Sequence, residues 1–449
     1  MVPNIIALWK RVMSNAYLSG STWQLAERMV NLAVGLLVTV YLMRHLGPGK
    51  YGIWSYAQSY MFLFSSLTTL GLQSVVVREL AKRELPAEQL LGSALLLMFG
   101  GSVLMVLVCA GSALLYQGAT LSFWMILLVA GSNIFLSLNV ISFYFQAVVK
   151  TKYTAMAMLL QDVLDAVGKL AFIFFKWSLL FLGVIYLVEV IMMVAALSYL
   201  YFRQGGRMVS WSANKSVAIS LLKSSLPLGI SGAMIALYMR LDQVLLEYFH
   251  STAAVGEYSA GIKIVELWYM LPMILLPNLL PMFVQAHKDN QTLYNKALQG
   301  VYSLTFWVPF IISIIMTCFA SPLTHVLFGQ QYQCAGVVLQ IAIWGCIFTF
   351  YGVASNLFML PNNLQRYALH KTLLGLLVCL VGSLLLIPAY GVVGAAIATL
   401  LGYMSATLLA NVIIKPLRQN AWFFFSAFFN IRMNIISLLS MVRLKREGA

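Results

Sequence analysis

Charged residues are scarce in this sequence of 449 residues: 9% are Asp, Glu, Lys or Arg, while 61% are hydrophobic. A soluble protein carries roughly a quarter charged residues, which cover its surface. So few charges exclude a water-soluble globular protein, and a lipid bilayer must surround most of the chain. Backbone polar groups in a bilayer need partners within the protein, so only helices or a closed β-barrel remain.

The sequence also lacks the alternating ten-residue segments of a transmembrane barrel. Its apolar runs are about twenty residues long, the length of a helix that crosses a bilayer. Cysteine is scarce as well: the five cysteines are scattered and none are spaced as C-x-x-C. We therefore expect neither a disulfide framework nor a metal site. No cleavable signal peptide is expected, because the first apolar run starts near residue 22 and exceeds signal-peptide length.

Residues 47–52, GPGKYG, spell the G-x-G-x-x-G of dinucleotide-binding proteins. That fingerprint requires a preceding strand and a βαβ unit, and the flanking apolar runs are helical in length. We expect a tight turn between two spans instead, with Pro48 starting the second helix and the glycines allowing close backbone approach. The sequence therefore indicates no cofactor.

Apolar runs and their polar breaks predict an all-α polytopic membrane protein with about twelve transmembrane helices. Pro227 is expected to bend the seventh helix, and Pro272, Pro277 and Pro281 the eighth. The expected spans are 22–43, 51–72, 90–116, 121–148, 155–175, 177–201, 217–248, 256–283, 297–318, 334–360, 367–387 and 391–414.

Basic residues give the chain a net charge of +15, which in a soluble protein would suggest nucleic acid. Here they gather in every second loop. One set of loops holds fifteen Lys and Arg residues, whereas the other holds Lys50, Lys176 and Arg44. The positive-inside rule places the rich set and both termini in the cytoplasm. We expect a membrane protein with no nucleic-acid partner.

The C-terminal segment is less regular than the spans. Residues 421–431 are apolar, but Arg432 and Asn434 interrupt the run before it resumes at 435–442. A thirteenth span would place the basic C-terminus outside, against the charge rule. We therefore expect residues 415–449 to form a cytoplasmic interfacial tail with aromatic anchors.

A repeat divides the chain in two. A shift of 204 residues aligns 40–58 with 244–262, so that Gly52 meets Gly256 and Ser55 meets Ser259. The shift is close to six helices, an even number, and both halves therefore share one orientation. The expected organisation is an N-terminal six-helix lobe at 1–202, a cytoplasmic linker at 203–216, a C-terminal six-helix lobe at 217–414 and the tail.

The same residues carry a family resemblance. YLMRHLGPGKYGIWSYAQSYMFLFSSLTTLGLQSVVVRELAKRE (41–84) resembles the signature of the first two helices of Wzx-type polysaccharide flippases. These belong to the multidrug/oligosaccharidyl-lipid/polysaccharide exporter superfamily. Looser matches are YFQAVVKTKY (144–153), RLDQVLLEYFHSTAAVGEYSAG (240–261) and VLFGQQYQCAGVVL (326–339). The resemblance covers residues 20–414. Arginines expected in the peptidoglycan-precursor flippases are not matched, which argues against that branch.

The resemblance, which is to a bacterial family, implies a location in the bacterial inner membrane and two lobes around a central cavity. It further implies alternating access for an undecaprenyl-pyrophosphate-linked oligosaccharide in O-antigen, lipopolysaccharide or exopolysaccharide assembly. Membrane lipids, a polysaccharide polymerase and a chain-length regulator are the partners that it implies, and no enzymatic activity follows from it.

Ionisable residues inside the spans indicate function, because burying one in a bilayer costs several kcal/mol. Arg240 and Asp242 in the seventh span are two residues apart, so a straight helix directs them to different sides. Glu189 stands alone in the sixth. Stripes at helical spacing are Gln24, Glu27, Arg28 and Asn31 in the first span, Asp162, Asp165 and Lys169 in the fifth, and Ser259, Lys263 and Glu266 in the eighth.

Two readings of these charges stay open. Asp165 with Lys169, and Lys263 with Glu266, could simply neutralise each other, and we favour this for the fifth span. The resemblance places the first, second, seventh and eighth helices along the cavity. Cationic residues there would bind a pyrophosphate, an arginine with two hydrogen bonds. The expected pyrophosphate-binding residues are Arg28, Arg240 and Lys263, and the candidates for ion coupling are Glu27, Asp242, Glu266, Asp162 and Asp165.

Two other functions compete with this one. A multidrug exporter of the same superfamily would share the fold but favour carboxylates for cationic drugs. A membrane-embedded polysaccharide polymerase or ligase would need a sizeable outer loop, and the longest expected outer connections are about fifteen residues, short for loops that carry reacting groups.

Overall fold

The computed structural model describes residues 34–429, and these are almost entirely helical. By their contacts they form two units, residues 34–46 with 53–236 and residues 47–52 with 237–429. The first predicted span lies mostly outside the described residues, and so do Glu27 and Arg28. The all-α prediction is confirmed.

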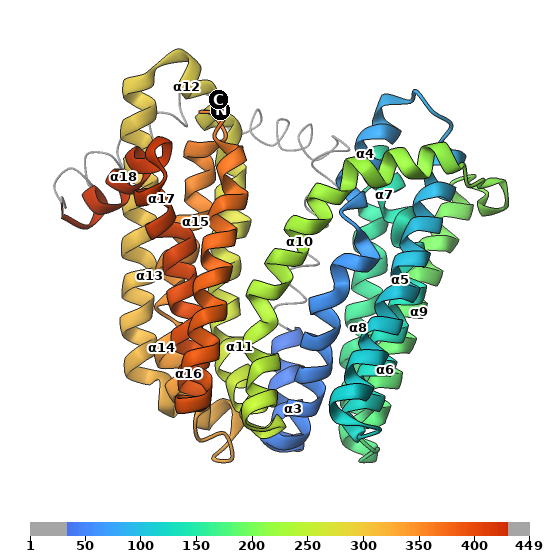
Figure 1. The fold of residues 1–449 in the computed structure, drawn as a ribbon, viewed down its shortest axis with the longest axis horizontal. Helices are drawn as coiled ribbons and strands as arrows, with labels where there is room; N and C mark the ends of the chain where they lie inside the picture. The colour runs from blue at the N-terminus through green and yellow to red at the C-terminus, as the bar shows by residue number, and fades with distance from the viewer. Residues whose placement is uncertain (1–33, 430–449) are drawn as a thin grey trace, which may run out of the picture. The chain divides into compact units, whose positions relative to one another are not determined.

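Unit 1 consists of long helices that pack side by side along their lengths. α8 and α6 both pack against α9, and α5 packs against α6 (Figure 1). Its elements are α3 (Leu36–Thr69) without residues 47–52, α4 (Leu72–Lys82), α5 (Ala87–Gln117), α6 (Leu121–Leu136), η2 (Ser137–Asn139), α7 (Val140–Ala147), α8 (Lys152–Phe175), α9 (Leu180–Arg203), η3 (Met208–Ser210) and the first part of α10 (Lys215–Phe249).

Unit 2 contains the end of α10 and the helices that follow it. α13 packs against α14, α15 and α18, and α11 packs against α14. Its elements are α11 (Thr252–Leu275), η4 (Leu276–Leu279), α12 (Leu280–Asp289), α13 (Gln291–Phe328), α14 (Ala335–Ala342), α15 (Gly345–Met359), η5 (Gln365–Tyr367), α16 (Ala368–Met404), a π-helical turn (Ser405–Leu409), α17 (Ala410–Ile413), η7 (Lys415–Leu417) and α18 (Arg418–Phe429).

The helices are consistent with about twelve membrane crossings. Among the described residues, nine helical segments are long and apolar enough to span a bilayer. The segments at both ends of this set each contain two helices, which meet at the non-helical residues Gly47 and Gly391. α8 is also long enough to cross, but it carries Asp162, Asp165 and Lys169. The chain is therefore a multi-pass membrane protein, as predicted.

Glycine permits the two sharp reversals between these merged helices. Gly47 has φ +71° and Gly391 has φ +54° with ψ −127°, backbone conformations that cost little only for a residue without Cβ. At the second reversal, Nε2 of His250 lies 2.7 Å from the carbonyl oxygen of Ile387. His250 thus satisfies a carbonyl close to the point where the helix breaks.

Residues 203–216 are packed onto unit 1. The indole nitrogen of Trp211 donates to the Tyr201 hydroxyl (3.1 Å), and the Asn214 amide donates to Oγ of Ser93 (3.1 Å). A Cβ on Gly92 would collide with the backbone of Ser212, so α5 and residues 203–216 are in close contact there. The predicted linker is an ordered part of unit 1, and the division between the two units falls within α10.

The helix breaks repeat with the predicted shift of 204 residues. α3 ends just before Leu70 and Gly71, both left-handed, and α11 ends at the corresponding place, where η4 starts. The fourth helix of each half is also broken, at η2 in the first half and between α14 and α15 in the second. Pro277 and Pro281 lie at the starts of η4 and α12, so proline helps to break the eighth helix, as predicted.

A reciprocal backbone contact joins the corresponding helix starts. A Cβ on Gly52 would collide with the carbonyl oxygen of Thr252, and a Cβ on Gly256 would collide with the carbonyl oxygen of Pro48. The shift of 204 converts Pro48 into Thr252 and Gly52 into Gly256. The two contacts are therefore related by the repeat, and each one requires a glycine.

Candidate functional site

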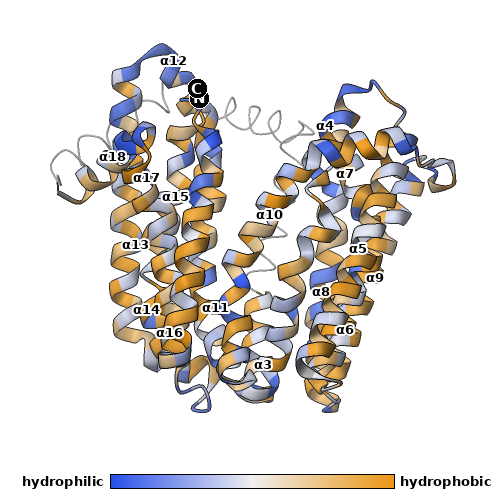
Figure 2. Cartoon of the chain, in the orientation of Figure 1, coloured by the Kyte–Doolittle hydropathy of each residue, from blue (hydrophilic) through white to orange (hydrophobic). Residues whose placement is uncertain are grey.

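The predicted residues that the structure describes fall into two groups. Arg240 and Asp242 on α10 lie in unit 2 with Lys263 and Glu266 on α11, whereas Asp162 and Asp165 lie on α8 in unit 1. Figure 2 shows hydrophilic segments within otherwise hydrophobic stretches of α8, α10 and α11.

In unit 2, one carboxylate lies between two cations. Nη2 of Arg240 is 3.1 Å from Oε1 of Glu266, and Nζ of Lys263 is 4.0 Å from Oε2. Between 26% and 40% of each side chain is exposed. Polar groups at a membrane helix's centre are costly unless they meet water or a partner. Arg240 also interacts electrostatically with Asp242, and the group is partly accessible from outside unit 2.

Asp242 has a separate and fully buried environment. It is 3% exposed, and its Oδ2 accepts hydrogen bonds from the hydroxyls of Tyr258 and Thr399, the latter at 3.1 Å. The backbone N–H of Gln243 donates to Oδ1 (2.7 Å). Asp242 and Arg240 point to different sides, as their spacing predicts. Asp242 therefore links α10, α11 and α16, and its acceptor sites are occupied.

An aromatic group of α10, α11 and α16 lies close to these polar residues. The ring of Tyr403 lies 5.0 Å from that of Tyr238 and 5.4 Å from that of Tyr269, both edge to face. A Cβ on Gly402 would lie 3.0 Å from the Tyr238 ring. Glycine thus lets α16 approach α10 closely enough for Thr399 to reach Asp242.

Unit 1 contains an acidic group on α8 and α9. Nζ of Lys169 is 2.6 Å from Oδ2 of Asp165, the internal pair that the sequence favours. Glu189 on α9 is 4% exposed and interacts electrostatically with both residues. Its Oε2 has no hydrogen-bond partner in the described part of the chain. Asp162 and Asp165 line a pocket with Val34 and Gly35.

A second pocket lies at the opposite ends of the unit 2 helices from α18. His250, Glu257, Cys334 and Tyr390 line it. The N–H of Cys334 donates to the Glu257 carboxylate. Burial raises the pKa of the Cys334 thiol, and the negative charge of Glu257 raises it further. Within residues 34–429, no group of three or more His, Cys, Asp and Glu residues could hold a metal ion.

Sequence reasoning missed residues whose partners lie on other helices. Glu189 was isolated in the sequence, and no periodic pattern linked it with Asp165. Tyr258 and Thr399 are uncharged and gave no signal of a bond with Asp242. Only their placement on neighbouring helices brings these residues together.

Comparisons with known proteins agree with this architecture. Residues 17–287 match the polysaccharide biosynthesis protein family, which is more than half of the chain. The probable flippase AglR of Haloferax volcanii is 23% identical over 87% of this chain and 82% of its own length. An uncharacterized membrane protein of Methanocaldococcus jannaschii is 28% identical, and the match spans 49% of this chain and less than half (43%) of that protein.

Two solved structures share the fold. A multidrug resistance MATE family transporter of the MOP superfamily, in an inward-facing conformation, matches with a TM-score of 0.70 and 14% identity, over 95% of this chain and 99% of its own. The lipid II flippase MurJ, in an inward closed conformation, matches with a TM-score of 0.68 and 13% identity, over 96% and 97%. Together with the sequence match, these likenesses mean that the chain belongs to the polysaccharide biosynthesis protein family and has the fold of the MOP superfamily.

Proposed function

We propose that this protein is a flippase for undecaprenyl-pyrophosphate-linked oligosaccharide repeat units in surface polysaccharide assembly. It acts by alternating access in the bacterial cytoplasmic membrane, with both termini cytoplasmic. Family membership supports a role in polysaccharide biosynthesis, and the archaeal relative over most of the chain is a probable flippase. The cargo crosses unchanged, so transport needs no catalytic residue.

The observation that carries the proposal is the group of Arg240, Glu266 and Lys263. Its two cations are partly exposed on membrane-spanning helices, where a cation costs about 2.5–3.5 kcal/mol on insertion scales. A pyrophosphate is an anion that such cations can bind, and a guanidinium can bind it with two hydrogen bonds. The two exposed cations would repel a cationic drug, which disfavours the multidrug alternative.

The acidic group of unit 1 is suited to ion coupling. Asp165 and Glu189 lie close to Lys169, and Asp162 lines the same pocket as Asp165. Neighbouring carboxyl groups in apolar surroundings favour uptake of protons or a cation. Glu266 and Asp242 are less suited, because cations or hydroxyl donors already occupy them.

The test of the pyrophosphate role uses a strain that lacks its own flippase. We expect Arg240→Ala to reduce surface polysaccharide roughly tenfold or more, because a charge-assisted hydrogen bond contributes about 1.5–3 kcal/mol. Arg240→Lys should retain partial function, since lysine keeps the positive charge but cannot form the two parallel hydrogen bonds of a guanidinium. Removing Glu266 as well should not restore export, whereas a purely structural pair would be rescued by the double change.

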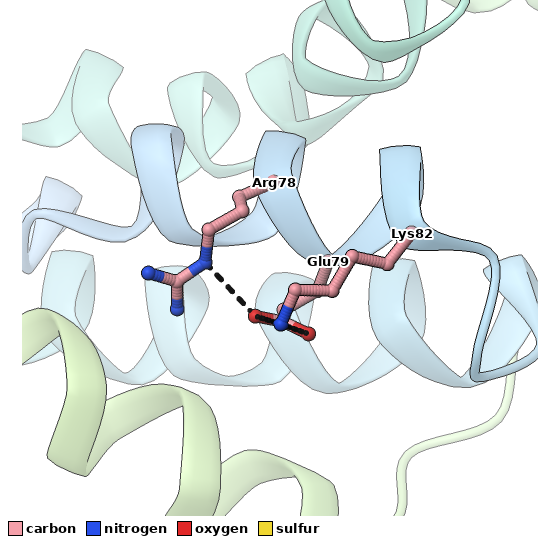
Figure 3. A network of polar contacts seen from close by, with 3 residues as sticks. All are labelled: Arg78, Glu79 and Lys82. Atoms are coloured by element: carbon pink, nitrogen blue, oxygen red, sulfur yellow. Dashed lines mark hydrogen bonds and ion pairs between the residues drawn. The ribbon is translucent and has the colours of Figure 1, made fainter.

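Unit 1 offers a matched control. On α4, Glu79 lies 3.0 Å from Arg78 and 3.1 Å from Lys82, a second Arg–Glu–Lys group (Figure 3). It lies at a helix end, and Arg78 is 59% exposed. Exposed ion pairs contribute about 0–1 kcal/mol to stability. Cells that carry Arg78→Ala should therefore export polysaccharide normally when immunoblots show the same amount of the protein in the membrane. Normal polysaccharide from Arg240→Ala and from Lys263→Ala would refute the pyrophosphate role.

A separate assay tests coupling. Purified protein in vesicles with an imposed pH gradient should move a fluorescent lipid-linked oligosaccharide faster than without the gradient. Glu189→Gln should remove this acceleration while leaving gradient-independent movement. Equal acceleration in Glu189→Gln and wild type would exclude Glu189 from coupling.

A further inference from the structure

The last third of the chain contains many basic residues but only one acidic residue, Glu447. Between Asp289 and Glu447 there is no Asp or Glu, while there are nine Lys and Arg residues. The positive-inside rule explains basic loops but not the missing acids, because Asp and Glu contribute little to orientation. The structure describes five of these cations, and none belongs to an ion pair within the described residues. Their counter-anions must come from outside this segment.

Three of these cations are exposed and lie on elements that contribute to one hydrophobic cluster of unit 2. Arg366 is in η5, Lys415 is in η7 and Arg418 begins α18. These elements share a hydrophobic cluster: Leu417 is part of it, and Tyr367 packs against it. Figure 2 shows the junction of α17 and α18 as a hydrophilic segment beside hydrophobic helices.

Local contacts hold two of these cations in place. Nη2 of Arg366 donates to the Tyr367 hydroxyl (3.0 Å), and its guanidinium lies 4.9 Å from that ring's centre. Nε of Arg418 donates to the carbonyl oxygen of Val412 (3.1 Å). Both guanidinium groups retain N–H donors beyond these bonds, so each can still bind an anion.

Helix α18 has one buried and one exposed aromatic face. Phe423 and Phe424 are 4% and 5% exposed, and their rings contact Tyr302 and Tyr351. On the other face, Trp422 is 57% exposed and Phe425, one turn later, is 41% exposed. An exposed aromatic face next to basic residues is typical of helices that lie in the membrane interface.

A buried polar chain fixes α18 to the interior. The Asn420 amide donates to Oγ of Ser355 (2.6 Å), and Nζ of Lys371 donates to the same oxygen (3.1 Å). Tyr302 in turn donates to Asn420. Lys371 is only 8% exposed, so this chain of hydrogen bonds ends in a buried cationic residue. A nearby anion would lower the electrostatic cost of that charge.

We propose that the junction of η5, η7 and α18 is a binding site for an anionic phospholipid. Arg366, Lys415 and Arg418 bind its phosphate, while Trp422 and Phe425 contact its acyl chains. The exposed aromatic residues favour a lipid over a free phosphate, which has no apolar part to cover them. The site is separate from the proposed translocation residues. The lipid-binding proposal therefore does not depend on which cargo the protein transports.

The test uses full-length protein reconstituted into vesicles that contain phosphatidylglycerol or phosphatidylcholine with brominated acyl chains. Bromine quenches tryptophan at close range, and the difference between wild type and Trp422→Phe isolates the signal of Trp422. We expect phosphatidylglycerol to quench this signal more strongly than phosphatidylcholine at equal mole fraction. The variant Arg366→Gln/Lys415→Gln/Arg418→Gln should lose that preference, by about fivefold in relative affinity for each cation removed.

A matched triple variant in unit 1 controls for the loss of net charge. Lys152, Arg203 and Arg207 are also exposed, and their replacement by Gln should leave the preference intact. Both triple variants should elute and melt as wild type. Three results would overturn the proposal: an unchanged preference in the α18 triple variant, an equal loss in the control, or displacement of the lipid by inorganic pyrophosphate, which would indicate a general phosphate site.

Discussion

Alanine in place of Gly52 or Gly256 tests the reciprocal contact between the helix starts. The added Cβ would overlap a carbonyl oxygen, that of Thr252 or that of Pro48. These partners are backbone atoms at the first turn of a helix and cannot rotate away as a side chain can. Overpacking costs about 1–3 kcal/mol, and we expect the upper part of this range because two helices must separate.

The assay is the thermal transition of purified protein in detergent, followed by intrinsic fluorescence. A kcal/mol shifts the transition by about 2–4 °C in domains of 150–250 residues, so each variant should melt several degrees below wild type. The double variant should lose less than the sum of the two single losses. Once one Cβ has separated the helices, the other finds room, and neighbouring sites are not additive.

Gly131 on α6 provides the control, since nothing lies within 4 Å of a Cβ placed there. Gly131→Ala should be neutral or stabilising, because alanine is favoured over glycine within a helix by up to about 1 kcal/mol. Melting of Gly52→Ala and Gly256→Ala at the wild-type temperature would refute this explanation. An equal decrease in the melting temperature of Gly131→Ala would refute it as well.

Three further predictions follow from the structure. Asp242→Ala should lower the melting temperature more than Thr399→Val, because it leaves several buried donors without an acceptor, each at about 1–3 kcal/mol; equal losses would contradict the assigned hydrogen bonds. Gly391→Ala should also destabilise the protein, by about 1–3 kcal/mol of backbone strain, and a wild-type melting curve would contradict the observed φ. In a cysteine-free background, Lys50→Cys should react with an impermeant maleimide in intact cells and Lys150→Cys only after permeabilisation; the reverse pattern would invert the proposed orientation.

Much of the fold follows from the sequence. Bilayer thickness sets the length of a spanning helix, so hydropathy gave an all-α membrane protein with about twelve crossings. The 204-residue shift also predicted which glycines correspond, and the structure places Gly52 and Gly256 in equivalent contacts. Glycine and proline act on the backbone locally, and this is why the turn at 47–52 and the broken eighth helix could be predicted.

The site was predicted only in part. Spacing along one helix indicated the Asp165–Lys169 pair and the divergence of Arg240 from Asp242, because both depend on the helical period alone. Two of the proposed residues, Glu27 and Arg28, lie outside the described part of the chain. The functional roles of the other residues stay predictions.

The tertiary structure decided which charges meet. It pairs Glu266 with Arg240 of another helix more closely than with Lys263 of its own, turns Asp242 toward Tyr258, and brings Glu189 to Asp165. Such contacts depend on how neighbouring helices are rotated and how closely they approach. The 3.6-residue period of a helix predicts which residues share a face. The packing of glycines and aromatic rings between helices determines which residues that face contacts.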